Sequence, residues 1–305
     1  MKHRFARRIA FAAGAWVALL LQSPAQLLVD GNPIVYSRSA RGEGLGLSYV
    51  ASDHDVGSVY WNPSSIAHLS RNYVSAGIFR LWDHTQMTGY AIVPFRISQH
   101  HALALGYSHT TLGANWQDPE VIFRVIDLAY AYGFSEFFSI GVRLCLSGGE
   151  SFSSTLWTTS GSVGVFYAPS SGLKYGASVE GLGVGIDYSR YKLNAVPSQT
   201  KIFRIGATFD FPLQKVSKFI AFTISGEKHY GTEGYNFFLG SEVKPVPFLN
   251  LRIGYASETE SDPLFPDGVR YGIGIDLGNF ILDYCASPHI SSQRHDQFTV
   301  LFRVI

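Results

Sequence analysis

The sequence predicts an all-β protein, a 14-stranded antiparallel transmembrane β-barrel formed by residues 72–305. Three observations lead to this prediction: alternating strand-length segments, connections that alternate between short and long, and a low content of charge. Charged residues make up 15% of the 305 residues and aromatic residues 14%, whereas about 25% charged residues is usual in soluble domains. No run of about 20 apolar residues follows the N-terminal region, so a helical membrane protein is not expected.

The first 25 residues have the pattern of a secretory signal peptide. Four basic residues come first, residues 9–21 are apolar, and Ser23 and Ala25 place the cleavage site after Ala25. A single anchoring helix is the alternative, although this apolar run is short for a membrane span. Loss of the four basic charges takes the formal net charge from +1 to about −3, which leaves no basic surface for nucleic acid.

Segments of strand length with a period of two follow one another from residue 72 to residue 305. In 137–147 one face is large and apolar, and the other carries Ser, Gly, Arg143 and Cys145. A soluble sandwich would expose a charged face, whereas a small or weakly polar face suits the lumen of a transmembrane barrel. The predicted strands are 72–81, 86–95, 100–110, 121–133, 137–147, 156–167, 173–183, 201–211, 219–229, 234–243, 248–257, 269–277, 279–286 and 296–305.

The connections between these segments alternate in length. Tight turns are expected at 134–136, 169–172, 244–247 and Gly278, and longer loops at 111–120, 184–200, 258–268 and 287–295. Short turns on one rim and long loops on the other, with an even number of strands, are typical of bacterial outer-membrane barrels. We therefore expect the outer membrane of a Gram-negative-type bacterium, with its lipid as one partner.

Residues 26–71 precede the first strand and lack strand alternation. They contain a Gly-rich run, SARGEGLGLS, and a broken apolar segment, DVGSVYWNPSSIAHL. Together these runs resemble the N-terminal signature of the PorV/PorQ family, relatives of the FadL-type barrels. The matching residues are Ala40-Arg41, Gly44-Leu45-Gly46, Asp53 to Asp55, Tyr60-Trp61-Asn62-Pro63 and Ile66-Ala67, and the resemblance continues along nearly the whole chain. The chain departs from the family at Leu47, where the family has a glycine, and at Ile305, where an aromatic residue is usual.

The resemblance implies that residues 26–71 fold into the barrel lumen as a plug. The plug motif would then be Tyr60, Trp61, Asn62 and Pro63 with Gly44 and Gly46. Asn62-Pro63 is expected to end a short helix and turn the chain. The glycines at 42, 44 and 46 are expected to permit close contact with the barrel wall. A capped helix that covers one end of the barrel is the alternative.

Two charged residues lie on the small or polar face of predicted strands. They are Arg143 and Asp276. An Arg that faces lipid at mid-depth costs about 2–4 kcal/mol, so we expect both side chains to face the lumen and to bind either the plug or a permeant. Cys145 and Cys285 either pair in an oxidising compartment or stay unpaired, and the second interpretation is favoured.

Catalytic signatures are missing from the sequence, so no enzyme, cofactor or metal site is predicted. The chain has no GxSxG motif and no phosphate-binding or dinucleotide fingerprint. Adjacent His100 and His101 point to opposite faces of a strand and cannot share a metal. His289, His295 and Asp296 fall in the last long loop, which is expected to be a solvated polar loop rather than a metal site.

Two functions of different classes remain. The PorV/PorQ resemblance implies a non-enzymatic accessory of type IX-like protein secretion, with secretion components or secreted cargo as partners. The alternative is a FadL-like channel for uptake of small hydrophobic molecules. A channel is expected to show a continuous apolar pocket near the plug and a gap in the wall, whereas an accessory needs no conduit.

Overall fold

The structure is a computed structural model that describes most of the predicted barrel and part of the predicted plug. The described residues are 38–53, 55–69, 73–81, 86–112, 121–151, 154–170, 172–186, 201–213, 218–230, 234–257, 268–287 and 295–303. The predicted signal peptide lies outside the described residues. So do most residues of the four predicted long loops.

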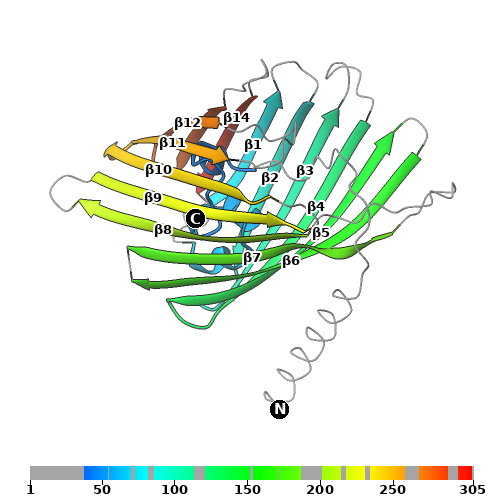
Figure 1. The fold of residues 1–305 in the computed structure, drawn as a ribbon, viewed down its shortest axis with the longest axis horizontal. Coiled ribbons are helices and arrows are strands. Elements are labelled where there is room, and N and C mark those ends of the chain that lie inside the picture. The colour runs from blue at the N-terminus through cyan, green and yellow to red at the C-terminus, as the bar shows by residue number, and fades with distance from the viewer. Residues whose placement is uncertain are drawn as a thin grey trace, which may run out of the picture.

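The strands close into a single antiparallel barrel (Figure 1). Each strand pairs with its neighbours in the sequence, and the last strand pairs with the first. The strands are β1 (Tyr73–Leu81), β2 (Gln86–Arg96), β3 (His101–Leu112), β4 (Val121–Gly133), β5 (Phe138–Ser151), β6 (Ser154–Ser170), β7 (Leu173–Ile186), β8 (Ile202–Leu213), β9 (Lys218–His229), β10 (Asn236–Val246), β11 (Leu249–Ser257), β12 (Gly268–Asp276), β13 (Phe280–Ser287) and β14 (His295–Arg303). The predicted fold class is confirmed, and every predicted segment overlaps one of these strands.

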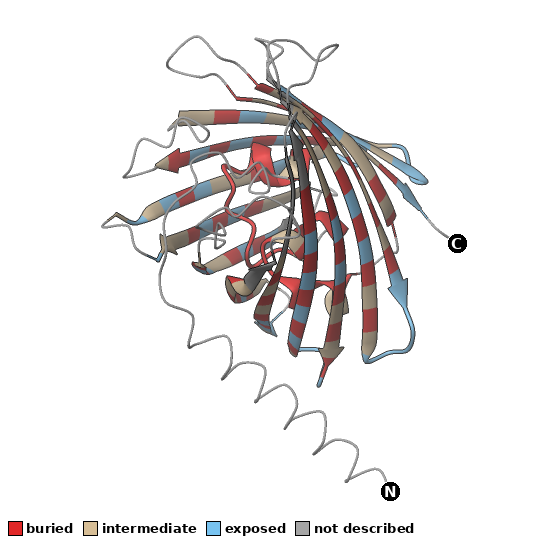
Figure 2. Cartoon of the chain, turned by 90° about the vertical axis from the view of Figure 1, so that its right-hand side faces the viewer, coloured by how far each residue is buried: buried red, intermediate tan, exposed pale blue. Residues whose placement is uncertain are grey.

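The large apolar side chains lie on the outside of the barrel. In β5, Val142 and Leu144 are exposed, whereas Arg143 and Cys145 between them are buried. Figure 2 shows the same alternation of exposed and buried residues along neighbouring strands. An apolar outer face around a closed barrel is the arrangement of outer-membrane proteins, which agrees with the predicted location. None of the helices in the described ranges is both long and apolar enough to cross a membrane.

Short connections at 97–100, 134–137, 247–248 and 277–279 lie at one end of the barrel. We call this end the short-turn rim. Tyr73 at the start of β1 and Arg303 at the end of β14 lie at the same end, because each pairs with the other across the closing strands. This arrangement follows from the alternating connections that the sequence predicted.

Residues 38–53 and 55–69 lie inside the barrel, and we call them the plug segment. They contain α2 (Ala40–Gly44) and two short 3-10 helices, η2 (Val56–Tyr60) and η3 (Pro63–His68). Helix α2 packs against β11 to β14, η2 against β1 and β2, and η3 against β3 to β6. Most residues of the plug segment are buried, and Figure 2 shows the segment within the ring of strands.

Each helix of the plug segment begins at a capping side chain. Ser39 accepts a hydrogen bond from the Gly42 amide, and Asp55 accepts one from the Gly57 amide. Asn62 caps η3, and Pro63 occupies its first turn, where a missing N–H costs no helical hydrogen bond. Helix η2 ends at Tyr60, just before Asn62-Pro63, as the sequence predicted, and the same pair also begins η3, which the sequence did not predict.

Candidate functional site

Ion pairs fasten the plug segment to wall strands around the lumen. These pairs are Arg38–Asp127, Arg41–Glu242, Glu43–Arg270 and Asp53–Lys174. The Arg41–Glu242 pair is 2.7 Å long and the Asp53–Lys174 pair 2.6 Å. Charges are tolerated in such buried places when they are paired. The pairs reach β4, β7, β10 and β12, so they hold the plug segment from several sides.

Neutral hydrogen bonds add to this attachment, and Asn62 is at their centre. The Asn62 side-chain amide donates to the carbonyl oxygens of Val50 and Val165, both at 2.9 Å. Its side-chain oxygen accepts from the Ser64 hydroxyl at 2.6 Å. Asn62 therefore links the two halves of the plug segment to each other and to β6.

We expect Asn62→Ala to lower the free energy of unfolding by about 2–3 kcal/mol, because the change removes a helix cap and leaves buried carbonyls without a donor. Urea titration in detergent micelles measures this change. Asn279→Ala, in the exposed turn between β12 and β13, is the control and should change the value by less than about 0.5 kcal/mol. An equal decrease in the free energy of unfolding in the two variants would contradict the role assigned to Asn62.

Lumen-facing glycines allow the wall to approach the plug segment closely. A methyl group added at Gly254 would collide with Leu45 and Gly46, and one added at Gly141 would collide with Pro63. Similar contacts with the plug segment occur at Gly106, Gly164, Gly176, Gly206, Gly240 and Gly272. The small face of the predicted strands is therefore shaped to hold the plug segment, in addition to lining a lumen.

The predicted plug glycines do not share one role. Gly44 lies against Gly272 of β12, and Gly46 has a φ of 65° with its backbone against β10 and β11. Gly42 instead faces Trp61 and Tyr49 within the plug segment, so its expected contact with the wall is wrong. The next residue after Gly46, Leu47, also has a φ of 65°. Leu47 thus keeps a left-handed backbone conformation that a glycine adopts more easily.

The aromatic residues of the predicted motif pack inside the plug. The Tyr60 ring lies 4.2 Å from the Arg38 guanidinium carbon and 5.2 Å from that of Arg143. Trp61 is buried and meets Tyr49 edge to face, with ring centroids 5.3 Å apart. These contacts place the plug motif at the junction of the plug segment and the wall.

The two predicted lumenal charges lie in different surroundings. Arg143 is buried, forms ion pairs with Asp127 and Glu180, and lies beside Tyr60 of the plug segment. Asp276 is at the short-turn end of β12, 3.5 Å from Lys244. Arg143 therefore belongs to the contact with the plug, whereas Asp276 lines a cavity at the rim.

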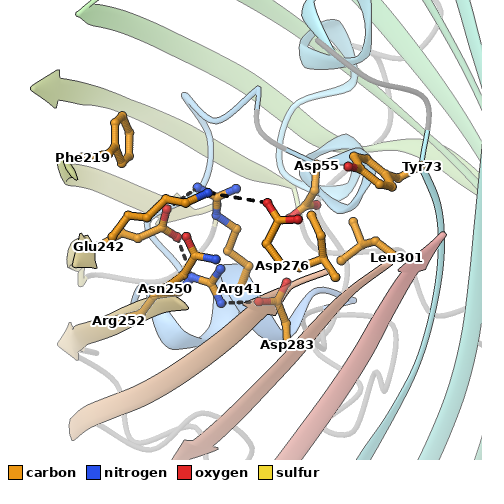
Figure 3. A pocket seen from close by; sticks show the side chains of 12 residues that line it. Arg41, Asp55, Tyr73, Phe219, Glu242, Asn250, Arg252, Asp276, Asp283 and Leu301 are labelled. Carbon is orange, nitrogen blue, oxygen red and sulfur yellow. Dashed lines mark hydrogen bonds and ion pairs between the residues drawn. The ribbon is translucent and has the colours of Figure 1, made fainter. Parts of the chain in front are cut away.

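This cavity has a volume of about 390 Å³ and lies between the plug segment and the short-turn rim (Figure 3). Its polar lining consists of Arg41, Asp55, Glu242, Lys244, Asn250, Arg252, Asp276 and Asp283. Its apolar lining consists of Phe219, Ile281 and Leu301, with Tyr73 beside them. A pocket of this volume is large enough for a small organic molecule.

A second hollow, of about 410 Å³, lies on the outer face of β8 to β12. Its lining includes the exposed side chains of Phe222, Leu239 and Ile253 around Ser241. The hollow faces outward and is separated from the lumen by paired strands. Within the described residues every strand pairs with both neighbours, although β7 continues past Glu180 without a partner on β8. The cavity beside the plug segment has a mixed rather than apolar lining.

One anchoring group has no motif in the sequence. Glu43 of the plug segment contacts both Arg270 of β12 and His295 of β14. The sequence predicts His295 in a solvated loop, but it is the first residue of β14 and is buried. The only sequence signal for Arg270 is a charge at a lumen-facing position of its strand.

The other titratable groups noted in the sequence have ordinary partners. His100 Nδ1 lies 2.8 Å from the Gly133 carbonyl oxygen, and His101 Nδ1 lies 2.7 Å from the Tyr130 hydroxyl. Cys145 and Cys285 are free, buried thiols. In the part of the chain that the structure describes, no three His, Cys, Asp or Glu side chains are grouped to hold a metal ion.

Solved channel structures share this fold. The Pseudomonas putida toluene transporter TodX is 10% identical, with a TM-score of 0.60 and coverage of 87% of this chain and 96% of that chain. The Ralstonia pickettii toluene transporter TbuX is 10% identical, with a TM-score of 0.57 and coverage of 86% and 96%. The monoaromatic hydrocarbon channel CymD is 11% identical, with a TM-score of 0.52 and coverage of 86% and 95%. No protein-family model and no functionally characterised sequence matches the chain.

At this level of identity the likeness establishes the fold alone. It agrees with the closed antiparallel barrel that the sequence predicted, and the FadL-type relationship stays a prediction. The closer relationship to PorV and PorQ stays a prediction from residues 40–67, and so does the secretion role that it implies.

Proposed function

We propose that the chain is an outer-membrane channel that admits small, largely hydrophobic molecules. The observation that carries this proposal is the 390 Å³ cavity between the plug segment and the short-turn rim, inside a closed barrel with an apolar outer face. The similar folds of TodX, TbuX and CymD, which are transporters or channels for toluene and monoaromatic hydrocarbons, support it.

The lining of the cavity suits a molecule that is partly apolar. Phe219, Ile281 and Leu301 replace water around an apolar body, while the polar side of the cavity keeps hydrogen bonds available. The plug segment blocks the free passage of bulk water because its ion pairs and backbone contacts fill the lumen beside the wall. Passage follows the concentration gradient, and no covalent step is required.

Uptake in a Gram-negative host tests this function. We expect cells that carry the barrel in the outer membrane to take up radiolabelled toluene several-fold faster than cells without it, because lipopolysaccharide otherwise slows entry. Uptake of a labelled disaccharide should not change. Equal toluene uptake with and without folded barrel would reject the channel.

The secretion role is not favoured by any specific feature of the described residues. It stays a prediction from the sequence resemblance, and copurification from outer membranes in mild detergent tests it. Recovery of the barrel together with secretion components or secreted cargo would support that role over transport.

A further inference from the structure

We infer that the cavity at the short-turn rim selects uncharged molecules that combine an apolar body with one hydrogen-bonding group, such as alcohols and amides. Carboxylates and amines of the same size are rejected. This inference rests on the proposed channel function, because it names the class of molecule that the channel's cavity accepts. The evidence is the pairing of charges in the lining, the polar group left open, and the apolar side chains that line the same cavity (Figure 3).

The charges that face the cavity are already paired. Glu242 of β10 contacts both Arg41 of the plug segment and Arg252 of β11. Asp283 of β13 contacts Arg252 on its other side. A charged ligand would have to break one of these buried pairs or remain without a counter-charge, and either course is costly.

The other charged residues of the lining, which are Lys244, Asp276 and Asp55, also have partners. Lys244 and Asp276 pair across β10 and β12 at 3.5 Å. Asp55 of the plug segment accepts hydrogen bonds from the Tyr49 hydroxyl and from the Gly57 amide. The cavity therefore offers neither a free cation for a carboxylate nor a free carboxylate for an amine among its described lining residues.

One polar group in the lining is open to a neutral partner. Asn250 of β11 lines the cavity, and its side chain makes no hydrogen bond within the described ranges. An amide supplies donors and an acceptor. A hydroxyl or amide group can therefore bind here without bringing a charge.

The apolar lining residues determine the rest of the molecule. Ile281 and Leu301 come from neighbouring strands, and Phe219 of β9 lines the cavity on another side. These side chains favour a ring or short alkyl body, since burial of apolar surface is favourable at about 25 cal/mol per Å². An alcohol with one aromatic ring satisfies both the apolar and the polar part of the lining.

Three matched ligands test the inference on the full chain in neutral detergent: benzyl alcohol, benzoate and benzylamine. Isothermal titration against the barrel, with empty micelles as the blank, gives each affinity. We expect benzyl alcohol to bind at least about tenfold more tightly than either charged ligand, because a charge without a partner is costly to bury. Asn250→Ala should weaken benzyl alcohol about fivefold, as expected for the loss of one hydrogen bond.

A change of lining charge provides the sharper test. Asp283→Asn removes one partner of Arg252, and benzoate affinity should rise at least about tenfold, as expected for a charge-assisted hydrogen bond. Asp276→Asn removes the partner of Lys244 at the partly exposed rim and should also raise the affinity for benzoate. This variant keeps the test available if Asp283→Asn does not fold. Glu136→Gln, the same acid-to-amide change in the exposed 134–137 turn, should leave all three affinities unchanged.

Heat-modifiable electrophoretic mobility confirms that each variant is folded. Benzoate binding equal to benzyl alcohol binding in the natural chain would overturn the inference, as would folded Asp283→Asn and Asp276→Asn variants with unchanged benzoate affinity. Toluene uptake without selective benzyl alcohol binding would overturn this inference but would still support the proposed channel function. Selective binding without toluene uptake would support the inference and reject the channel.

Discussion

Gly254→Leu is expected to expel part of the plug segment from the wall. A side chain at position 254 would collide with the backbone of Leu45 and Gly46, which has no flexible atoms to give way. Overpacking of this kind costs about 1–3 kcal/mol, so the released state should become roughly 5- to 150-fold more populated. Trypsin cleavage after Arg41, which in the natural chain is partly buried and paired with Glu242, measures that population.

The chain offers a matched control for this change. Gly89 of β2 is also a strand glycine, but a methyl group added there meets no atom within 4 Å. Gly89→Leu should therefore leave cleavage at Arg41 unchanged. Gly46→Ala should reproduce the effect of Gly254→Leu from the plug side, because it collides with β10 and β11 and strains a residue with φ of 65°. If Arg41 stays protected from trypsin in both Gly254→Leu and Gly46→Ala, close contact between the plug segment and the wall is contradicted.

Asp127→Asn is expected to weaken the attachment of the plug segment by about 3–5 kcal/mol, because it leaves the Arg38 guanidinium buried without its carboxylate. Asp127 and Arg38 are both almost fully buried, with side chains 4% exposed. Arg143, which also lies near Asp127, keeps its ion pair with Glu180. The expected readout is faster trypsin cleavage after Arg41 and a lower free energy of unfolding in urea.

A second substitution separates lost charge pairing from general damage. Arg38→Met in the Asp127→Asn background removes the unpaired cation and should recover most of the lost stability, since a buried pair is often replaceable by apolar groups. Glu136→Gln in the exposed turn is the control for loss of an acid. An Asp127→Asn variant that behaves like Glu136→Gln would show that this ion pair does not hold the plug segment.

Together these contacts make the plug segment part of the folded barrel. Arg38, Arg41 and Glu43 anchor its start on three separate strands, and Asn62 fixes its later half on β6. A molecule that crosses the lumen must therefore pass along the wall or move only a part of the segment. The cavity at the short-turn rim is the described space through which such a path would run.

The sequence by itself determined the barrel. Alternation in 137–147 placed Arg143 and Cys145 on one face and the large apolar residues on the other, and the turn near Gly278 separated β12 from β13. These signals are local, because a strand's two faces follow from a period of two and a turn from the residues within it. Strand number and the identity of the lipid face therefore needed no three-dimensional information.

Only the tertiary structure decided how the plug segment sits in the lumen. Glu43 contacts two residues that lie 227 and 252 positions later in the chain, and Gly254 of the wall touches Gly46 of the plug segment. No local pattern specifies such pairs, because they depend on the depth and rotation of the segment within the closed wall. For the same reason the sequence predicts a loop at His295, whereas pairing with β1 and contact with Glu43 make it a buried residue of β14. The contact of Asn62 with β6 is likewise decided by the tertiary structure.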